Sequence, residues 1–199
     1  MRAAPFVSGA VLAAVALLLG TRARAALAPG GISEMKVVFT TFRMSPVGVE
    51  MLKRLESFHS TRYVDAHGYS IGYGHFIRPG ETFREPISIE QASALLKADV
   101  GTVEAALNQL IEVPLYQWQF DALASFAYNV GTDIDADTIA EGLGDSTLLR
   151  LLNKGDVAGA AAQFALWNKT SSGGTKIVSA GLSNRREKER RLFEFGVYA

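Results

Sequence analysis

The fold is decided by residues 55–75, which read LESFHSTRYVDAHGYSIGYGH. Just before this stretch, apolar residues recur at helical spacing and predict a helix over residues 47–58. The helical spacing of apolar residues then gives way to a pattern typical of strands. Residues 61–65 and 69–73 are rich in β-branched and aromatic side chains. We predict two short strands joined near His67-Gly68, so a helix leads directly into a β-hairpin.

Downstream of the hairpin the apolar periodicity is helical throughout. Ser88 followed by Gln91 is the capping-box pattern that starts a helix, and residues 133–144 and 170–174 are interpreted as polar loops. One small β unit followed only by helices predicts an α+β fold with segregated strands, rather than alternating βαβ units. The predicted helices cover residues 88–110, 115–129, 148–153 and 181–195. A further helix is predicted to begin after Asp156 and to run through Trp167.

Composition limits the classes of protein to consider. The chain has 199 residues, enough for one domain with its own core. It contains no cysteine, which excludes a disulfide scaffold, a thiolate nucleophile and a cysteine zinc site. Of 20 basic and 20 acidic residues, residues 1–31 hold three arginines and no acid, leaving 17 basic against 20 acidic. A nucleic-acid partner is therefore not indicated, and the charged run 185–191 is interpreted as a solvated helix face.

The N-terminal residues differ in character from the rest. Residues 3–21 carry no charge, and a helix of that length barely crosses a hydrocarbon core of about 30 Å. Two interpretations stay open, a cleaved secretory signal and a weak anchor that later leaves the inner membrane. Both predict export to the periplasm or cell wall. We expect residues 1–31 to be this signal or signal-anchor segment with its linker, and residues 32–199 to form one monomeric domain.

Two carboxylates flank the junction of helix and hairpin. Glu56 ends the predicted helix, where burial among apolar side chains would raise its pKa and suit it to donate a proton. Asp65 lies in the first predicted strand. If His67-Gly68 form a two-residue turn, Asp65 and Ser70 are directly opposite and share one face, where they can hold a water. Such a pair of carboxylates suits the cleavage of a glycosidic bond, although an Asp bonded to a nearby turn explains the same spacing.

The order of the motifs resembles the phage-type lysozymes, the endolysin muramidases of glycoside hydrolase family 24. Their pattern is Glu, eight residues, Asp, five residues, Thr, then Ile-Gly-x-Gly-His. Here it stands as Glu56, Asp65 and Ser70-Ile71-Gly72-Tyr73-Gly74-His75, and residues 119–131 (QFDALASFAYNVG) also resemble the family. The resemblance covers about residues 44–195.

This resemblance implies a lysozyme-like fold, with a small β-hairpin lobe, a mostly helical lobe and the active-site cleft between them. It implies an inverting muramidase that hydrolyses the β-1,4 bond between N-acetylmuramic acid and N-acetylglucosamine in peptidoglycan glycan strands and so lyses the cell. No cofactor or metal is expected. Some family members carry a signal-anchor-release segment, which the N-terminus resembles. The implied site comprises Glu56 as general acid, Asp65 and Ser70 on the water, Tyr69, Phe76 and Asn129 as candidate substrate contacts, and Gly72, Gly74 and His75 in structural roles.

The sequence departs from the family pattern at the hairpin. Ser70 replaces the family threonine, and the hairpin is one residue shorter. The hydroxyl group is kept, but the methyl group that restricts the threonine rotamer is lost. We expect function to survive, with the water held less firmly.

Three alternatives remain open. His59, His67 and His75 with Asp65 make a zinc site conceivable, as in wall amidases, although His75 at the strand exit suits a structural ion pair better. A lytic transglycosylase would cut the same bond without water and needs mainly one acid. A catalytically degenerate wall-binding module would not depend on Glu56 at all.

Overall fold

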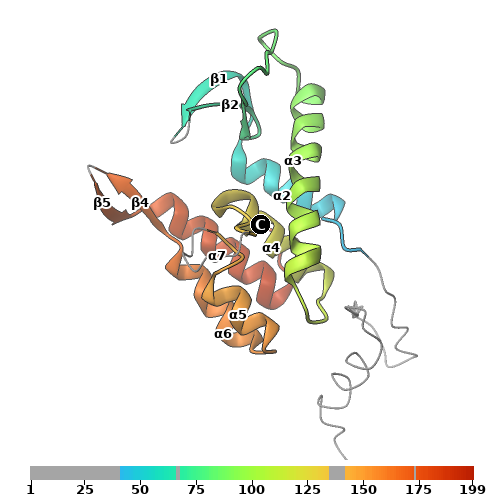
Figure 1. Cartoon of the computed structure of the whole chain (residues 1–199), viewed down its shortest axis with the longest axis vertical. Helices are drawn as coiled ribbons and strands as arrows, with labels where there is room; N and C mark the ends of the chain where they lie inside the picture. Colours follow the sequence, from blue (N-terminus) through green and yellow to red (C-terminus); the bar gives the residue numbers. More distant parts are fainter. Residues whose placement is uncertain (1–40, 66–67, 135–141, 173) are drawn as a thin grey trace, which may run out of the picture.

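A computed structural model shows a small sheet and a cluster of helices, with the long helix α3 (Ile89–Leu110) running beside both (Figure 1). The structure describes residues 41–65, 68–134, 142–172 and 174–199. The predicted signal or anchor segment, residues 1–31, lies outside these ranges. Within them, no helix combines the length and the apolar character needed to cross a bilayer.

The first described helix, α2 (Pro46–Glu56), begins as its sequence predicts. The Ser45 hydroxyl accepts a hydrogen bond from the Gly48 amide at 3.1 Å, and proline occupies the first helical position. The fully buried Asp121 accepts bonds from both the amide and the hydroxyl of Ser45, and from the Tyr198 hydroxyl at 2.6 Å. One carboxylate therefore joins the start of α2 to the helical lobe and to the last residues of the chain.

The small lobe is an antiparallel sheet in the order β1 (His59–Asp65), β2 (Gly68–Gly72), β3 (His75–Phe76). The predicted hairpin is confirmed, but its turn lies one residue earlier than predicted, which moves the strand partner of Asp65 by two residues. Asp65 pairs with Gly68 and Tyr63 pairs with Ser70, so the two-residue connection is 66–67 rather than His67-Gly68. The prediction that Asp65 and Ser70 are directly opposite was wrong; they are diagonal neighbours on one face, since side chains two residues apart share a face.

The helical lobe is built around α4 (Gln117–Val130). Every residue from Gln119 to Ala127 is buried, because α2, α3 and α7 (Ala180–Phe195) all pack against this helix. The predicted capping box of Ser88 and Gln91 at the start of α3 is confirmed. The remaining helices of this lobe are α5 (Thr147–Asn153), α6 (Val157–Gln163) and the 3-10 turn η1 (Phe164–Leu166).

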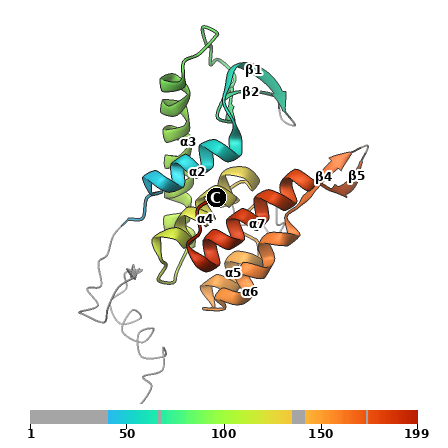
Figure 2. The ribbon, with the colours of Figure 1, turned by 180° about the vertical axis from the view of Figure 1, so that it is seen from behind.

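A second hairpin, β4 (Lys169–Ser172) with β5 (Thr175–Val178), replaces the loop predicted at 170–174. The expectation of one β unit followed only by helices was therefore wrong. In both ribbon views this hairpin projects from the start of α7 on the same side of the molecule as β1 and β2 (Figures 1 and 2). The two hairpins thus border one side of the junction between the lobes.

The interpretation of residues 185–191 as a solvated face was also wrong for three of these seven residues. Arg185, Arg186 and Glu189 are buried, while Glu187 and Arg191 are exposed. These three buried residues recur at spacings of three and four, so they form one inward face of α7.

Candidate active site

Glu56 lies at the point where the two lobes meet. It is the last residue of α2, and the chain turns at once into β1 through Ser57, whose φ of +61° lies in a region that side-chain-bearing residues rarely adopt. The Glu56 side chain is 15% exposed, so it is largely shielded from water. A Cβ atom at Gly74, whose φ is +85°, would lie 3.4 Å from Glu56 Oε2. Glycine at this position leaves the second carboxyl oxygen open.

Arg185 is the main neighbour of Glu56 that sequence reasoning missed. Its Nη2 lies 2.7 Å from Glu56 Oε1, and its Nε donates to Glu189 Oε1 at 3.0 Å. Burial alone would lower the pKa of Arg185, but the charges of Glu56 and Glu189 outweigh burial and raise it. The expected shielding of Glu56 by apolar side chains is therefore incomplete, because a buried guanidinium holds one of its oxygens. The signal was present in the sequence as an Arg–Glu pair four residues apart.

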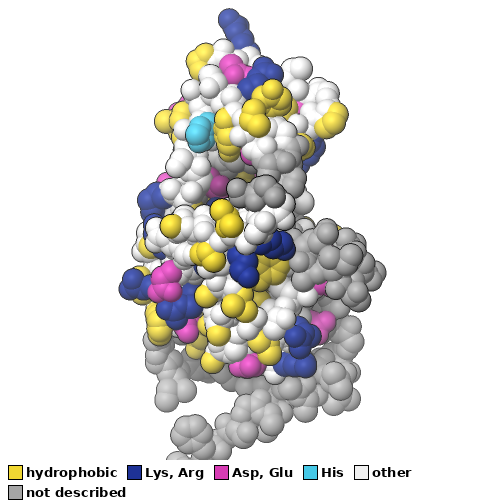
Figure 3. Space-filling view, turned by 90° about the vertical axis from the view of Figure 1, so that its left-hand side faces the viewer, with side chains coloured by type: hydrophobic (Ala, Val, Ile, Leu, Met, Phe, Trp, Pro, Cys, Tyr) yellow, Lys and Arg dark blue, Asp and Glu magenta, His cyan; other side chains and the backbone are white. Residues whose placement is uncertain are grey.

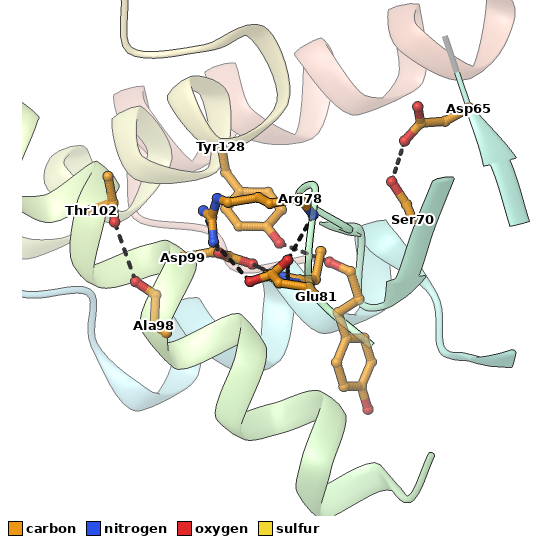
Figure 4. Close-up of polar contacts among 10 residues, drawn as sticks. Asp65, Ser70, Arg78, Glu81, Ala98, Asp99, Thr102 and Tyr128 are labelled. Carbon is orange, nitrogen blue, oxygen red and sulfur yellow. Dashed lines mark hydrogen bonds and ion pairs between the residues drawn. The ribbon is translucent and has the colours of Figure 1, made fainter. Parts of the chain in front are cut away.

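Asp65 and Ser70 meet on one face of the hairpin, as predicted. Ser70 is 1% exposed, and its hydroxyl donates to Asp65 Oδ2. Figure 4 shows the two side chains pointing toward one another from neighbouring strands. Asp65 itself is exposed. The carboxylate thus faces solvent and is hydrogen-bonded on its inner side by Ser70.

Tyr63 is a second site residue that the sequence analysis did not identify. It lies two residues before Asp65 on β1 and pairs directly with Ser70 across the two strands. Burial raises the pKa of the phenol, and the charges of Glu56 and Asp65 raise it further. Because one phenol experiences both charges, the structure brings Glu56 and Asp65 to the same site.

The three candidate substrate contacts are not equivalent. Phe76 pairs directly with Ser70 and therefore lies on the Ser70 face of the sheet, 40% exposed. Tyr69 is 53% exposed but is adjacent to Ser70 in β2, so its side chain points to the opposite face. Asn129 is exposed at the end of α4, and its Oδ1 accepts a bond of 2.8 Å from Arg186.

Comparison with known proteins establishes the family. The family model described as phage lysozyme matches residues 53–189. An endolysin of Acyrthosiphon pisum secondary endosymbiont phage 1 is 38% identical over 152 residues, covering 76% of this chain and 97% of the relative. The chain belongs to the phage lysozyme family.

This lysozyme is also similar to the SAR-endolysin of Bacteriophage PS119, at 35% identity over 176 residues, 86% of this chain and 92% of the relative. Among solved structures, the endolysin from Escherichia coli O157:H7 phage FAHEc1 gives a TM-score of 0.69 at 36% identity, covering 79% of this chain and 97% of that one. These similarities confirm the predicted α+β lysozyme fold. As a phage lysozyme, the protein is a glycoside hydrolase that degrades peptidoglycan.

His75 of the lysozyme lies among charged side chains at the end of the sheet. The ring is buried, with Nδ1 at 2.7 Å from Asp99 and Nε2 at 3.3 Å from Glu81, a cluster that Arg78 completes in Figure 4. These contacts tie the end of the sheet to α3. His59 instead lies against the Tyr63 ring, with the ring centroids 4.3 Å apart.

His59 and His75, the two histidines that the structure describes, contact different partners. His67 lies outside the described residues, and among those that the structure places, no three His, Cys, Asp or Glu side chains are grouped as metal ligands. Gly72 lies where the sheet meets α3. Its φ is +69°, and a Cβ atom there would lie 3.1 Å from Ala92 of α3, so glycine allows the sheet to pack closely on that helix.

A pocket of about 410 Å³ lies between the end of α2 and the start of α7 of the lysozyme. Its lining includes Leu55 from α2 and Asn184, Arg185 and Lys188 from α7. Figure 3 shows the side of the molecule toward which both hairpins project, with Lys and Arg side chains concentrated on the helical lobe. Arg185 therefore contributes both to this pocket and to the contact with Glu56.

Proposed function

We propose that this lysozyme is an endolysin muramidase that hydrolyses the β-1,4 bond between N-acetylmuramic acid and N-acetylglucosamine, with inversion at the anomeric carbon. The observation that carries the proposal is the meeting of two unlike carboxyl groups at the lobe junction. Glu56 is largely shielded and held by Arg185, whereas Asp65 is exposed and hydrogen-bonded by Ser70. Different surroundings allow one carboxyl group to serve as acid and the other as base.

The proposed step uses both groups in a single displacement. Arg185 holds Oε1 of Glu56, which leaves Oε2 on the Gly74 side to donate its proton to the glycosidic oxygen. Asp65 and Ser70 hold a water on the other side of the sugar, and Asp65 accepts a proton as the water oxygen attacks the anomeric carbon. The bond to the leaving oxygen breaks as the new bond forms, so the product has inverted configuration and a free reducing end.

The decisive test is Glu56→Gln on purified peptidoglycan. We expect kcat to fall by at least about 100-fold, because a positioned general acid contributes roughly 100- to 10,000-fold. Glu50→Gln is the matched control, since Glu50 lies on the same helix, is 59% exposed and pairs with Lys53 across one turn. Unchanged turnover in Glu56→Gln would reject the acid and support a degenerate wall-binding module.

The products of the wild-type enzyme separate the remaining alternatives. We expect muropeptides with a reducing muramic acid end, first released as the inverted anomer. An anhydro end would instead identify a lytic transglycosylase. A retained anomer would make Asp65 a nucleophile and would contradict the water-mediated step.

Phe76 is the aromatic side chain that we propose to contact the glycan strand. It lies on the Ser70 face, and aromatic faces pack well against the apolar face of a sugar ring. We expect Phe76→Ala to lower kcat/KM by roughly tenfold, mainly through KM, because burial of an aromatic ring contributes about 1–3 kcal/mol. Tyr69→Ala removes a similar exposed ring from the opposite face and should change kcat/KM less than twofold. An equal loss in both variants would contradict this assignment.

We further propose that residues 3–21 hold the enzyme transiently at the inner membrane before it acts in the periplasm or cell wall. The support is their uncharged sequence and the similarity to a SAR-endolysin that covers 86% of this chain. Immunoblots of membrane and soluble fractions test the proposal. A full-length protein that moves from the membrane to the soluble fraction is expected, and a shortened soluble form would instead identify a cleaved signal.

A further inference from the structure

The β4–β5 hairpin projects from the helical lobe with its strands in solvent (Figures 1 and 2). All four residues of β5 are exposed, and so are Lys169, Thr170 and Ser171 of β4. A two-stranded hairpin without a covered face is only marginally stable on its own. Burial of apolar surface therefore does not explain why this hairpin forms, and its strands are open to a partner.

The base of the hairpin is nevertheless held against the helices. The Ser179 amide donates to the Asn168 carbonyl at 2.8 Å, and Asn168 Nδ2 donates to the Ser183 hydroxyl of α7 at 3.1 Å. Trp167 packs edge-on against Phe126 of α4, with 5.5 Å between the ring centroids. A fixed base with exposed strands is the arrangement expected of a binding element on a rigid scaffold.

Helix α7 also sets the position of the hairpin relative to the candidate active site. β5 ends at Val178 and α7 begins at Ala180. Arg185, which contacts Glu56, lies about 8 Å further along the helix axis, at roughly 1.5 Å per residue. In both ribbon views the hairpin projects on the side of β1 and β2 (Figures 1 and 2), and Asp65 lies in β1. A polymer bound at Glu56 and Asp65 is therefore within reach of the hairpin.

One face of the hairpin is basic. Lys169 and Ser171 of β4 share a face, and Ser171 pairs with Lys176 of β5. The two lysines are therefore diagonal neighbours on one face, about 7 Å apart at their Cβ atoms. Residues 168–179 contain no acidic residue, so these charges have no partner within the hairpin. The opposite face is uncharged, because the hairpin contains no other charged residue.

Two ammonium groups at this spacing suit a peptide that carries free carboxylates. Side chains two residues apart on an extended peptide lie on one side, about 6.6 Å from one another at roughly 3.3 Å per residue. This distance matches the spacing of the two lysines. In peptidoglycan the free carboxylates belong to the short peptides attached to the glycan strand, whereas the sugars offer an ammonium group only neutral hydroxyl and amide groups.

We propose that the basic face of the β4–β5 hairpin, formed by Lys169 and Lys176, binds the carboxylates of the peptides attached to the glycan strand. The inference rests on the proposed endolysin function and adds to it a contact with the peptide part of the substrate. The alternative is that the two lysines only discourage edge-to-edge pairing of the exposed strands.

The experiment combines a change of charge in the enzyme with a change of charge in the substrate. Wild type and Lys169→Gln/Lys176→Gln are compared by steady-state kinetics on soluble peptidoglycan fragments, either native or with their free carboxyl groups converted to amides. On native fragments we expect the KM of the variant to be roughly 3- to 10-fold higher at unchanged kcat, because two exposed ion pairs are lost from substrate and transition state alike. On amidated fragments the two enzymes should have the same KM. Added salt should reduce the difference on native fragments.

Lys97→Gln/Lys154→Gln is the matched control, because it removes two positive charges from exposed positions elsewhere. Helix α3, which carries Lys97, lies on the other side of the molecule from the hairpin in both ribbon views (Figures 1 and 2), and Lys154 lies between α5 and α6. The KM of the control should match that of wild type on both substrates, because distant surface charges are largely screened. Thermal unfolding of both double variants verifies that they fold.

Three results would overturn the inference. One is an equal KM of Lys169→Gln/Lys176→Gln and wild type on native fragments, which would leave the lysines only the role at the strand edges. Another is a difference that persists on amidated fragments, because the contact would then not involve carboxylates. The third is an equal rise of KM in the control variant, which would indicate an effect of net charge. The end group of the wild-type product tests the hydrolytic function separately, because it does not depend on the hairpin lysines.

Discussion

Glu189→Gln tests how much the buried ion pairs next to Glu56 contribute to stability. Glu189 is fully buried, and its carboxylate lies 3.0 Å from Arg185 Nε, 2.9 Å from Arg186 Nε and 2.8 Å from the Ser125 hydroxyl that donates to it. Glutamine keeps the volume and one acceptor but removes the negative charge. Two neighbouring guanidinium groups then share only Glu56 as an anionic partner in this cluster.

The magnitude follows from the burial of the network. Removal of one member of a buried ion pair typically costs about 3–5 kcal/mol, because the remaining charge is left uncompensated. In a domain of this size each kcal/mol lowers Tm by roughly 2–4 °C. We therefore expect the Tm of Glu189→Gln to fall by about 6–20 °C.

The same substitution two residues earlier provides the control. Glu187 pairs with Arg190 at 2.9 Å, but its side chain is 52% exposed, and exposed pairs contribute about 0–1 kcal/mol. Differential scanning calorimetry of both variants at neutral pH measures the difference. If Glu189→Gln lowered Tm no more than Glu187→Gln does, the argument that burial makes this network important for stability would be refuted.

Two further predictions concern the site loop and acid stability. Gly74→Ala places a methyl group beside Glu56 Oε2, so lytic activity should fall roughly tenfold. Gly155→Ala is the control, because Gly155 also has a positive φ, +81°, but nothing lies near its Cβ; this variant should show only the backbone strain of about 1–2 kcal/mol. Equal lytic activities of the two variants would contradict the prediction. Hydrogen bonds from backbone N–H groups hold the pKa of Glu81 and Glu85 below the ordinary value of 4.5. Stability from these groups is complete above that pH and is lost as pH falls through the lowered values, so Tm should drop as the pH falls below 4.5. In the Glu81→Gln/Glu85→Gln double variant, Tm should fall less steeply with decreasing pH. An unchanged dependence of Tm on pH would show that these two carboxylates do not cause the acid sensitivity.

Much of the site could be predicted from the sequence because its parts are local. Glu56, Asp65 and Ser70 lie within one helix–hairpin unit, where the change of period and the capping signals act over a few residues. The turn was predicted one residue too late, because two adjacent two-residue turns fit the same composition. Only the pairing of Tyr63 with Ser70 in three dimensions separates them.

The parts that the sequence did not reveal depend on long-range packing. The contact between Arg185 and Glu56 joins α7 to α2, and no periodicity along α7 states which partner its inward face meets. The charged run there was interpreted as solvated because charge usually indicates exposure, whereas its two buried arginines form ion pairs with Glu189 and Glu56 inside the protein. The β4–β5 hairpin was missed although Thr175, Ile177 and Val178 follow a glycine pair, which is a hairpin signal.

The carboxylate of Asp121 also restricts which residues can occupy position 48. A Cβ atom on Gly48 would lie 2.7 Å from the Asp121 carboxyl group, so any larger residue there must push α2 away from α4. Glu56 ends the same helix and would move with it. In a randomised library, a side chain at position 48 should therefore be accepted only together with a smaller residue at position 121, and the two positions form a single unit of sequence variation.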